Sequence, residues 1–150
     1  MDNREVCEKL NKLIKLDVDA VHAYKQAIDA CTMEDLRSNL LRFQEDHQRH
    51  IRDLSQQVRA CGGEPEVETS WAGFLIEGFT AITAQGDHSA LLAMRGNEEL
   101  TNRTYEGALN AADLPTEVRA LLERNFSDEQ RHLAWIKDQL NMRVWERKAA

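Results

Sequence analysis

The sequence predicts an all-α protein whose long helices form a four-helix bundle. The chain has 150 residues, enough for one domain with a single core, and only 7 Gly and 2 Pro to interrupt regular structure. Apolar residues recur every three or four positions over long stretches, which is the spacing of one helical face. We therefore expect a single domain, residues 1–150, with four long helices.

The first two long helices are expected at about 3–31 and 33–61. Thr32 followed by Asp35 resembles a capping box in which Asp stands in for the usual Glu, and it predicts the start of the second helix. The Gly-Gly pair that begins at Gly62 predicts its end, because glycine adopts a left-handed cap easily.

The second pair of long helices is expected at about 87–112 and 115–141, after a shorter helix at about 70–84. Asp87 can cap the third long helix, and Pro115 suits the first turn of the fourth. The long connection before Asp87 would carry the chain from one end of the bundle to the other. The predicted fold is two helical hairpins joined by a long crossover that contains a short helix.

Composition excludes several classes of function. A net charge of −7 argues against a nucleic-acid or anionic-membrane partner, which would need a concentrated basic face. No apolar run approaches the roughly 20 residues that span a bilayer, and the N-terminus lacks the pattern of a signal peptide, so we expect a cytoplasmic protein. Without a Cys-x-x-Cys pair, the three cysteines are expected to be reduced core thiols: Cys7, Cys31 and Cys61.

Six ionisable residues interrupt the apolar stripes where a core would hold hydrophobic side chains. The four long helices contribute one, two, one and two of them, respectively: Asp17, His47, His50, Glu98, Glu129 and His132. Burying each alone would cost several kcal/mol, so their partners must be one another, a metal, or both. Residues three apart on a helix project side by side, so both members of each pair can reach one point.

The chain also repeats a phrase. Gln-Arg-His followed by an aliphatic residue occurs at His50 and again at His132, and His47 in the first copy takes the place of Glu129 in the second. In both halves a carboxylate precedes a tyrosine by two helical turns: Asp17 before Tyr24, and Glu98 before Tyr105. Two hairpins related by an approximate twofold axis would bring all six groups to one central layer.

Polar residues near these positions receive a different interpretation. Asp19 and His22 fall off the apolar stripe of the first helix, and we expect them in solvent. Residues that flank the six groups are expected to face solvent or to support the groups from outside: Asp46, Gln48, Arg49, Gln130 and Arg131.

This layout resembles the ferritin-like superfamily, in which two helices each give one Glu and the other two each give Glu-x-x-His. Glu98 and the Glu129/His132 pair match that pattern. Tyr24 and Tyr105 match tyrosines that rubrerythrin-like members carry seven residues after the first ligand. The stretch RGNEELTNRTYEGALNAADLPTEVRALLERNF is similar to a widespread bacterial family of ferritin-like proteins of unknown function, with a looser resemblance in the first half.

Two departures from the ferritin-like pattern affect the expected site. Asp17 is one methylene shorter than the Glu of the pattern, and His47 replaces one of two carboxylates that would bridge metals. Sites rich in imidazole suit iron, zinc and copper. The resemblance implies one or two transition-metal ions, iron foremost and zinc or copper as alternatives, with Tyr24 and Tyr105 donating hydrogen bonds to the carboxylates. A metal-free network of ion pairs is the competing interpretation.

Three functions remain open on this evidence. The resemblance implies a rubrerythrin-like oxidoreductase acting on dioxygen or peroxide, which would need an external electron donor because the chain has no rubredoxin-like Cys-x-x-Cys module. A non-catalytic metal-binding or stress-related bundle and a metal-free structural bundle are the alternatives. The apolar face of the crossover helix suits a lid, a core element or a homodimer contact: Trp71, Phe74, Phe79 and Ile82.

Overall fold

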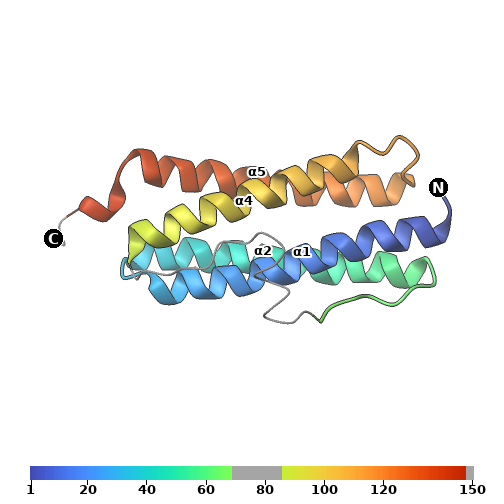
Figure 1. Ribbon diagram of the computed structural model, residues 1–150, viewed down its shortest axis with the longest axis horizontal. Helices are drawn as coiled ribbons and strands as arrows, with labels where there is room; N and C mark the ends of the chain where they lie inside the picture. The colour runs from blue at the N-terminus through green and yellow to red at the C-terminus, as the bar shows by residue number, and fades with distance from the viewer. Residues whose placement is uncertain (69–85, 148–150) are drawn as a thin grey trace.

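A computed structural model of the chain describes residues 1–68 and 86–147. It contains four long helices and a short 3-10 helix (Figure 1): α1 (Asn3–Ala30), α2 (Glu34–Ala60), α4 (Asp87–Leu109), α5 (Thr116–Asn141) and η1 (Val144–Glu146). These described residues contain no strand. The predicted all-α four-helix bundle is confirmed, whereas the predicted short helix at 70–84 and its apolar face lie outside the described residues.

The four long helices pack as two antiparallel hairpins. α1 packs against α2, and α4 packs against α5 (Figure 1). The hairpins meet through α1 against α4 and through α2 against α5. α1 and α5 are therefore diagonally opposite, and an interior layer can receive side chains from all four helices.

The connection between α2 and α4 crosses the length of the bundle. α2 ends near the start of α1 (Figure 1). The backbone N–H of Gly86 instead donates to the carbonyl of Ala30 at the far end of α1 (3.0 Å). The return begins along α1: Asn11 donates through Nδ2 to the carbonyl of Glu64 (3.1 Å), and its Oδ1 accepts from the backbone N–H of Glu66 (2.9 Å). The predicted crossover topology follows from these contacts.

Asp87 ties the start of α4 to the start of α2. Its carboxylate accepts from the backbone N–H groups of Thr32 (2.8 Å) and Met33 (3.0 Å) and from the hydroxyl of Thr32 (2.6 Å). The capping box predicted at Thr32 is wrong, because Met33 is the N-cap of α2 and makes no side-chain cap. Asp87 does not cap α4 either, since Gly86 is the N-cap of that helix. The carboxylate instead supplies acceptors that the α2 terminus lacks.

Replacing Asp87 with alanine is expected to destabilise the bundle by about 1–2 kcal/mol, because the α2 terminus loses its hydrogen-bond acceptor. For a chain of this size, that lowers the thermal midpoint by roughly 2–8 °C. The matched control is Asp29→Ala, which removes only an exposed ion pair with Lys25 and should change stability by less than about 0.5 kcal/mol. Equal midpoints for the two variants in thermal unfolding would contradict this role for Asp87.

α4 ends at Leu109 rather than near the predicted residue 112. The side chain of Arg119, from the first turns of α5, donates to the carbonyl of Leu109 (3.0 Å) and also to that of Ala111. These bonds satisfy carbonyl groups that the helix itself leaves unpaired at its C-terminus. The chain can therefore turn toward Pro115 earlier than the apolar stripe suggests.

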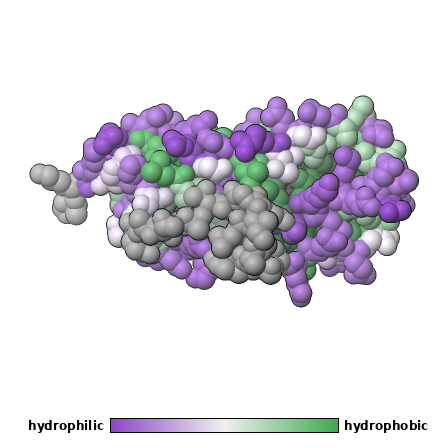
Figure 2. All heavy atoms as spheres, viewed as in Figure 1, coloured by the Kyte–Doolittle hydropathy of each residue, from purple (hydrophilic) through white to green (hydrophobic). Residues whose placement is uncertain are grey.

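The core is aliphatic above and below the central polar layer. Its fully buried aliphatic side chains include Leu10, Leu13, Ile14, Leu36, Leu40, Leu54, Leu91, Met94, Leu122 and Ile136. On the face seen in Figure 2, hydrophilic residues cover much of the described surface, with hydrophobic ones showing between them. None of the described helices is both long enough and apolar enough to cross a bilayer.

Two expectations about individual residues are wrong. Asp19, expected in solvent, is fully buried, because every residue of α1 from Leu16 to Ala20 is buried at that level of the bundle. All three cysteines are free thiols, and Cys31 is buried as a core thiol should be, but Cys7 and Cys61 are only partly buried.

Candidate metal centre

All six polar residues that interrupt the stripes meet in the central layer of the bundle. α1 supplies Asp17, α2 supplies His47 and His50, α4 supplies Glu98, and α5 supplies Glu129 and His132. Each side chain is at most 1% exposed. Their ligand atoms form two overlapping groups within which all atoms lie within 4.8 Å of one another: Asp17, His47, His50 and Glu129, and His47, Glu98, Glu129 and His132.

His47 and Glu129 belong to both groups and occupy the middle of the layer. Nδ1 of His47 lies 2.6 Å from Oδ1 of Asp17, and its Nε2 lies 3.1 Å from Oε1 of Glu98. Oε1 of Glu129 lies 3.4 Å from Nδ1 of His47 and 3.4 Å from Nδ1 of His50. His47 therefore links the acids of the two hairpins, while Glu129 faces imidazoles of α2.

The outer ends of the layer are formed by one acid and one histidine each. Nδ1 of His50 lies 3.2 Å from Oδ1 of Asp17. Nδ1 of His132 lies 3.2 Å from Oε1 of Glu98. In both pairs the histidine presents Nδ1 to the interior, so the two ends have the same arrangement.

Each of these histidines directs its other nitrogen to an aspartate of the opposite hairpin. Nε2 of His50 lies 2.9 Å from Oδ2 of Asp128, and Nε2 of His132 lies 2.7 Å from Oδ2 of Asp46. A histidine that binds metal commonly donates its second N–H to a carboxylate in this way, which fixes its tautomer and ring orientation. Arg49 also donates to Asp128, and Arg131 donates to Asp46 (2.8 Å).

The two aspartates occupy equivalent positions in the repeated sequence, and this equivalence indicates that they have the same role. Both stand four residues before the shared histidine of the repeated phrase, in DHQRH and DEQRH. Support of the opposite histidine agrees with one of the two roles expected of Asp46, whereas the sequence interpretation missed Asp128.

The tyrosines also cross between the hairpins. Tyr24 of α1 donates to Oε1 of Glu98 on α4, and Tyr105 of α4 donates to Oδ2 of Asp17 on α1 (2.6 Å). Nδ2 of Asn125 donates in turn to the Tyr105 hydroxyl (3.2 Å). Each terminal carboxylate is thus held by a phenol from the other hairpin. The expected hydrogen-bonding role of the tyrosines fits these contacts.

Sequence reasoning missed Thr101. Its hydroxyl lies 3.0 Å from Oε2 of Glu98 and 3.1 Å from Oε2 of Glu129. A threonine three residues after Glu98 lies on the same helix face, and that spacing was the available signal. Thr101 can hold the carboxylates of α4 and α5 side by side.

The histidines of the layer are strongly basic. Burial alone would lower the pKa of His47, but the Glu129, Asp17 and Glu98 carboxylates raise it to about 9. Burial would also lower the pKa of His50, but Asp17 and other nearby carboxylates raise it to about 12. Burial would likewise lower the pKa of His132, but Glu98 and other nearby carboxylates raise it to about 11. Protons can therefore supply the positive charge that the acids of the layer need.

The pKa values of the two glutamates are shifted in opposite directions. Burial would raise the pKa of Glu98, but His132 and His47 hold it well below its usual range. Burial raises the pKa of Glu129, and the neighbouring Glu98 carboxylate raises it further. Glu129 is therefore the acid whose charge is least well compensated in this arrangement.

One buried oxygen tests whether a metal ion fits the layer. Oε1 of Glu129 has no hydrogen-bond partner among the described residues. The nearest donors, Nδ1 of His47 and of His50, lie 3.4 Å away, so this buried carboxylate oxygen can still accept a closer contact from a metal ion. Carboxylate oxygens and imidazole nitrogens are also the donors that iron, zinc and copper accept. The residues present therefore fit a transition-metal ion.

Without metal, the protein is expected to lose stability as the pH rises from about 6.5 toward 9. The folded-state pKa of His47 is raised to about 9, so its contribution is complete below its ordinary value of 6.5 and disappears as pH passes through the raised value. His47 alone would contribute up to about 3 kcal/mol. Urea unfolding in chelator at several pH values measures this slope, and a midpoint that is flat or rises over this range would contradict it.

Comparisons with known proteins agree with the fold. Residues 5–111 match the model of a family described as "Domain of unknown function (DUF2383)". The match includes the first half of the chain, where the looser resemblance was expected, and stops before α5. A bacterioferritin of Desulfovibrio desulfuricans is 24% identical over 139 residues, which cover 89% of this chain and 73% of that protein.

An X-ray structure of the Desulfovibrio desulfuricans bacterioferritin, described with a diiron site, superposes on this chain with a TM-score of 0.75. The two sequences are 23% identical, and the superposition covers 91% of this chain and 78% of the other. This likeness shows the fold, which is that of a ferritin-like four-helix bundle. The chain accordingly belongs to the family of the domain of unknown function DUF2383.

Proposed function

We propose that the central layer binds one or two transition-metal ions. One group of residues would hold an ion at the Asp17 and His50 end, the other would hold an ion at the Glu98 and His132 end, and Glu129 and His47 are shared between them. The observation that carries the proposal is the overlap of two ligand groups around a buried Glu129 oxygen without a hydrogen-bond partner among the described residues.

Iron is the ion that we propose first, with zinc or copper as alternatives. The donor set contains three carboxylates and three imidazoles, a mixture that ferrous iron accepts well. The similar bacterioferritin is described with a diiron site, which favours the same ion here. Three carboxylates leave less negative charge than a site with four would have, so one ion or an unequal pair is favoured over a symmetric pair.

We further propose that the iron-loaded protein is an oxidoreductase of the rubrerythrin kind, acting on dioxygen or peroxide. Bound iron would supply the one-electron redox chemistry. The chain's own residues would exclude bulk water, since the six side chains are buried, and would hold the ligands in place through Tyr24, Tyr105, Asp46 and Asp128. Electrons would come from an external donor.

A metal-free polar network is the second candidate, and a specific observation favours it. The Asp17–His47 contact of 2.6 Å and the raised histidine pKa values allow protons to hold the layer together. A protein of this kind would have a structural role only. Oε1 of Glu129, which accepts no hydrogen bond from the described part of the chain, opposes this interpretation.

Elemental analysis of protein purified without chelators decides between metal and network. About one or two equivalents of a transition metal per chain, lost in His132→Ala, would support the proposed site. His88→Ala is the matched control, because His88 is an exposed histidine at the start of α4, far along the helix from Glu98. Absence of metal after loading with ferrous iron, zinc and copper would reject the site.

Kinetics of the iron-loaded protein decides between enzyme and binder. Repeated oxidation and re-reduction, with peroxide or dioxygen consumed in each cycle in the presence of a chemical reductant, is expected of an oxidoreductase. Stoichiometric metal binding without turnover would reject the oxidoreductase and leave a metal-binding or storage bundle.

A further inference from the structure

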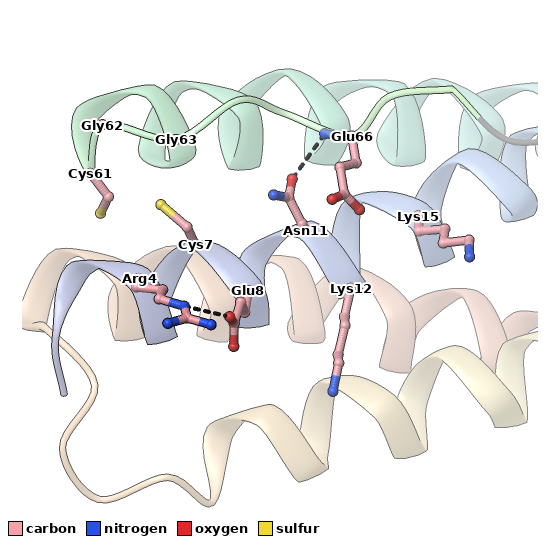
Figure 3. A pocket seen from close by; sticks show the side chains of 10 residues that line it. All are labelled: Arg4, Cys7, Glu8, Asn11, Lys12, Lys15, Cys61, Gly62, Gly63 and Glu66. Carbon is pink, nitrogen blue, oxygen red and sulfur yellow. Dashed lines mark hydrogen bonds and ion pairs between the residues drawn. The ribbon is translucent and has the colours of Figure 1, made fainter.

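Two cysteines from different helices face each other far from the central layer. Cys7 lies in the second turn of α1, and Cys61 is the C-cap of α2. Figure 3 shows their side chains pointing toward one another between the two helices. Burial raises the pKa of Cys61, and the nearby Cys7 thiol raises it further. The two sulfurs are thus neighbours although the cysteines are far apart in sequence.

The backbone after α2 is shaped around the Cys7 sulfur. A Cβ placed on Gly63 would lie 2.7 Å from Sγ of Cys7, closer than such atoms approach in real proteins. Sγ of Cys7 also lies 3.6 Å from the carbonyl oxygen of Val58 in the last turns of α2. Glycine at this position lets the chain pass close to the thiol, and the thiol is held against the end of α2.

The pair is open to small molecules. Both cysteines are partly buried and line a surface cavity of about 640 Å³ with Gly62, Gly63 and polar side chains of α1 (Figure 3). Cys31 differs, because it is buried beside Asp87, and burial raises the pKa of its thiol to about 12. Among the three cysteines, reagents therefore have ready access to Cys7 and Cys61.

We propose that Cys7 and Cys61 form a reversible disulfide that ties the start of α1 to the end of α2. The oxidant is a low-molecular-weight disulfide of the glutathione class. One cysteine thiolate attacks the reagent's S–S bond and releases one thiol, and the second cysteine then displaces the other thiol from the mixed disulfide. The protein loses two electrons and two protons, and the reagent is reduced to two thiols.

A disulfide at this position would stabilise the first hairpin. It would close a loop that contains nearly all of α1 and α2, and such cross-links restrict the unfolded chain. Burial, together with the Cys7 thiol, raises the pKa of Cys61. The exchange is accordingly expected to be slow at neutral pH and faster in mild alkali, because the thiolate is the attacking form.

The test equilibrates the full chain in buffers of oxidised and reduced glutathione, with chelator present so that the proposed metal plays no part. The expected product has lost two hydrogen atoms, yields a peptide in which Cys7 is linked to Cys61, and unfolds about 5–10 °C higher than the reduced protein. Dithiothreitol should reverse all three changes.

Single substitutions separate the pair from the third cysteine. Cys31→Ser should form the linkage as the parent does, whereas Cys7→Ser and Cys61→Ser should form only mixed disulfides with glutathione. Lack of the Cys7–Cys61 peptide at every glutathione ratio, or its formation only between two chains, would overturn the proposal.

Discussion

Glu129→Gln is expected to weaken transition-metal binding by at least about a hundredfold without destabilising the metal-free bundle. Glu129 is the carboxylate shared by both ligand groups, so its loss affects every ion that the layer holds. In the metal-free protein its charge is poorly compensated, because burial and the Glu98 carboxylate raise its pKa. Glutamine removes that charge and keeps the shape. Competitive metal titration and urea unfolding in chelator measure the two effects.

Glu98→Gln is the matched control, since Glu98 is the other buried glutamate of the layer. It accepts from Tyr24 and Thr101 and pairs with His47 and His132, and those histidines lower its pKa. Removing this charge breaks the buried ion pairs of Glu98 with His47 and His132, which keep only their other carboxylate partners, and should destabilise the metal-free protein by about 3–5 kcal/mol. Similar unfolding midpoints for the two variants, or metal binding by Glu129→Gln as tight as that of the parent, would contradict the assignment.

His47→Glu is expected to destabilise the metal-free protein by about 3–5 kcal/mol and to make its folding depend on metal. His47 lies between Asp17 and Glu98 and pairs with both acids. A glutamate there would replace the central cation with a fourth carboxylate, and the remaining histidines could not compensate all of the acids. Added ferrous iron or zinc supplies the missing charge, so the thermal midpoint should recover in a concentration-dependent way.

Gln48→Glu controls for the added negative charge, because it puts the same side chain on the exposed face of α2. Its stability should stay within about 0.5 kcal/mol of the parent, with or without metal. A His47→Glu protein as stable as the parent in chelator would show that His47 is not the internal counter-charge. Failure of metal to restore the variant would reject a metal site in the layer.

The fold was predictable because the polar exceptions follow the same periodicity as the apolar residues. Asp17, Glu98 and the two histidine-containing pairs interrupt their stripes in register, and the repeated phrase relates one hairpin to the other. Burial without partners is too costly for such groups, so their convergence could be inferred before any coordinates. The periodicity of the apolar residues predicts which face of a helix a residue occupies. The spacing to the tyrosines predicts how far along the helix the polar groups lie.

Contacts set by tertiary structure were not predictable in the same way. Asp87 serves the terminus of α2 rather than its own helix, a relation between residues that are distant in sequence. Arg119 ends α4 from the neighbouring helix. The cysteines Cys7 and Cys61 become neighbours only because α2 returns to the start of α1. Sequence rules for helical periodicity and capping describe one element at a time, so they do not predict partners that come from another element.

The crossed contacts of the central layer also bear on how the chain folds. Tyr24, Tyr105, Asp46 and Asp128 each complete a group that belongs to the other hairpin. A hairpin formed alone would bring its acids and imidazoles together without the phenols and aspartates that satisfy them. Half-assembled intermediates therefore gain little from this layer, and its full benefit comes only when both hairpins dock, which favours cooperative, all-or-none folding.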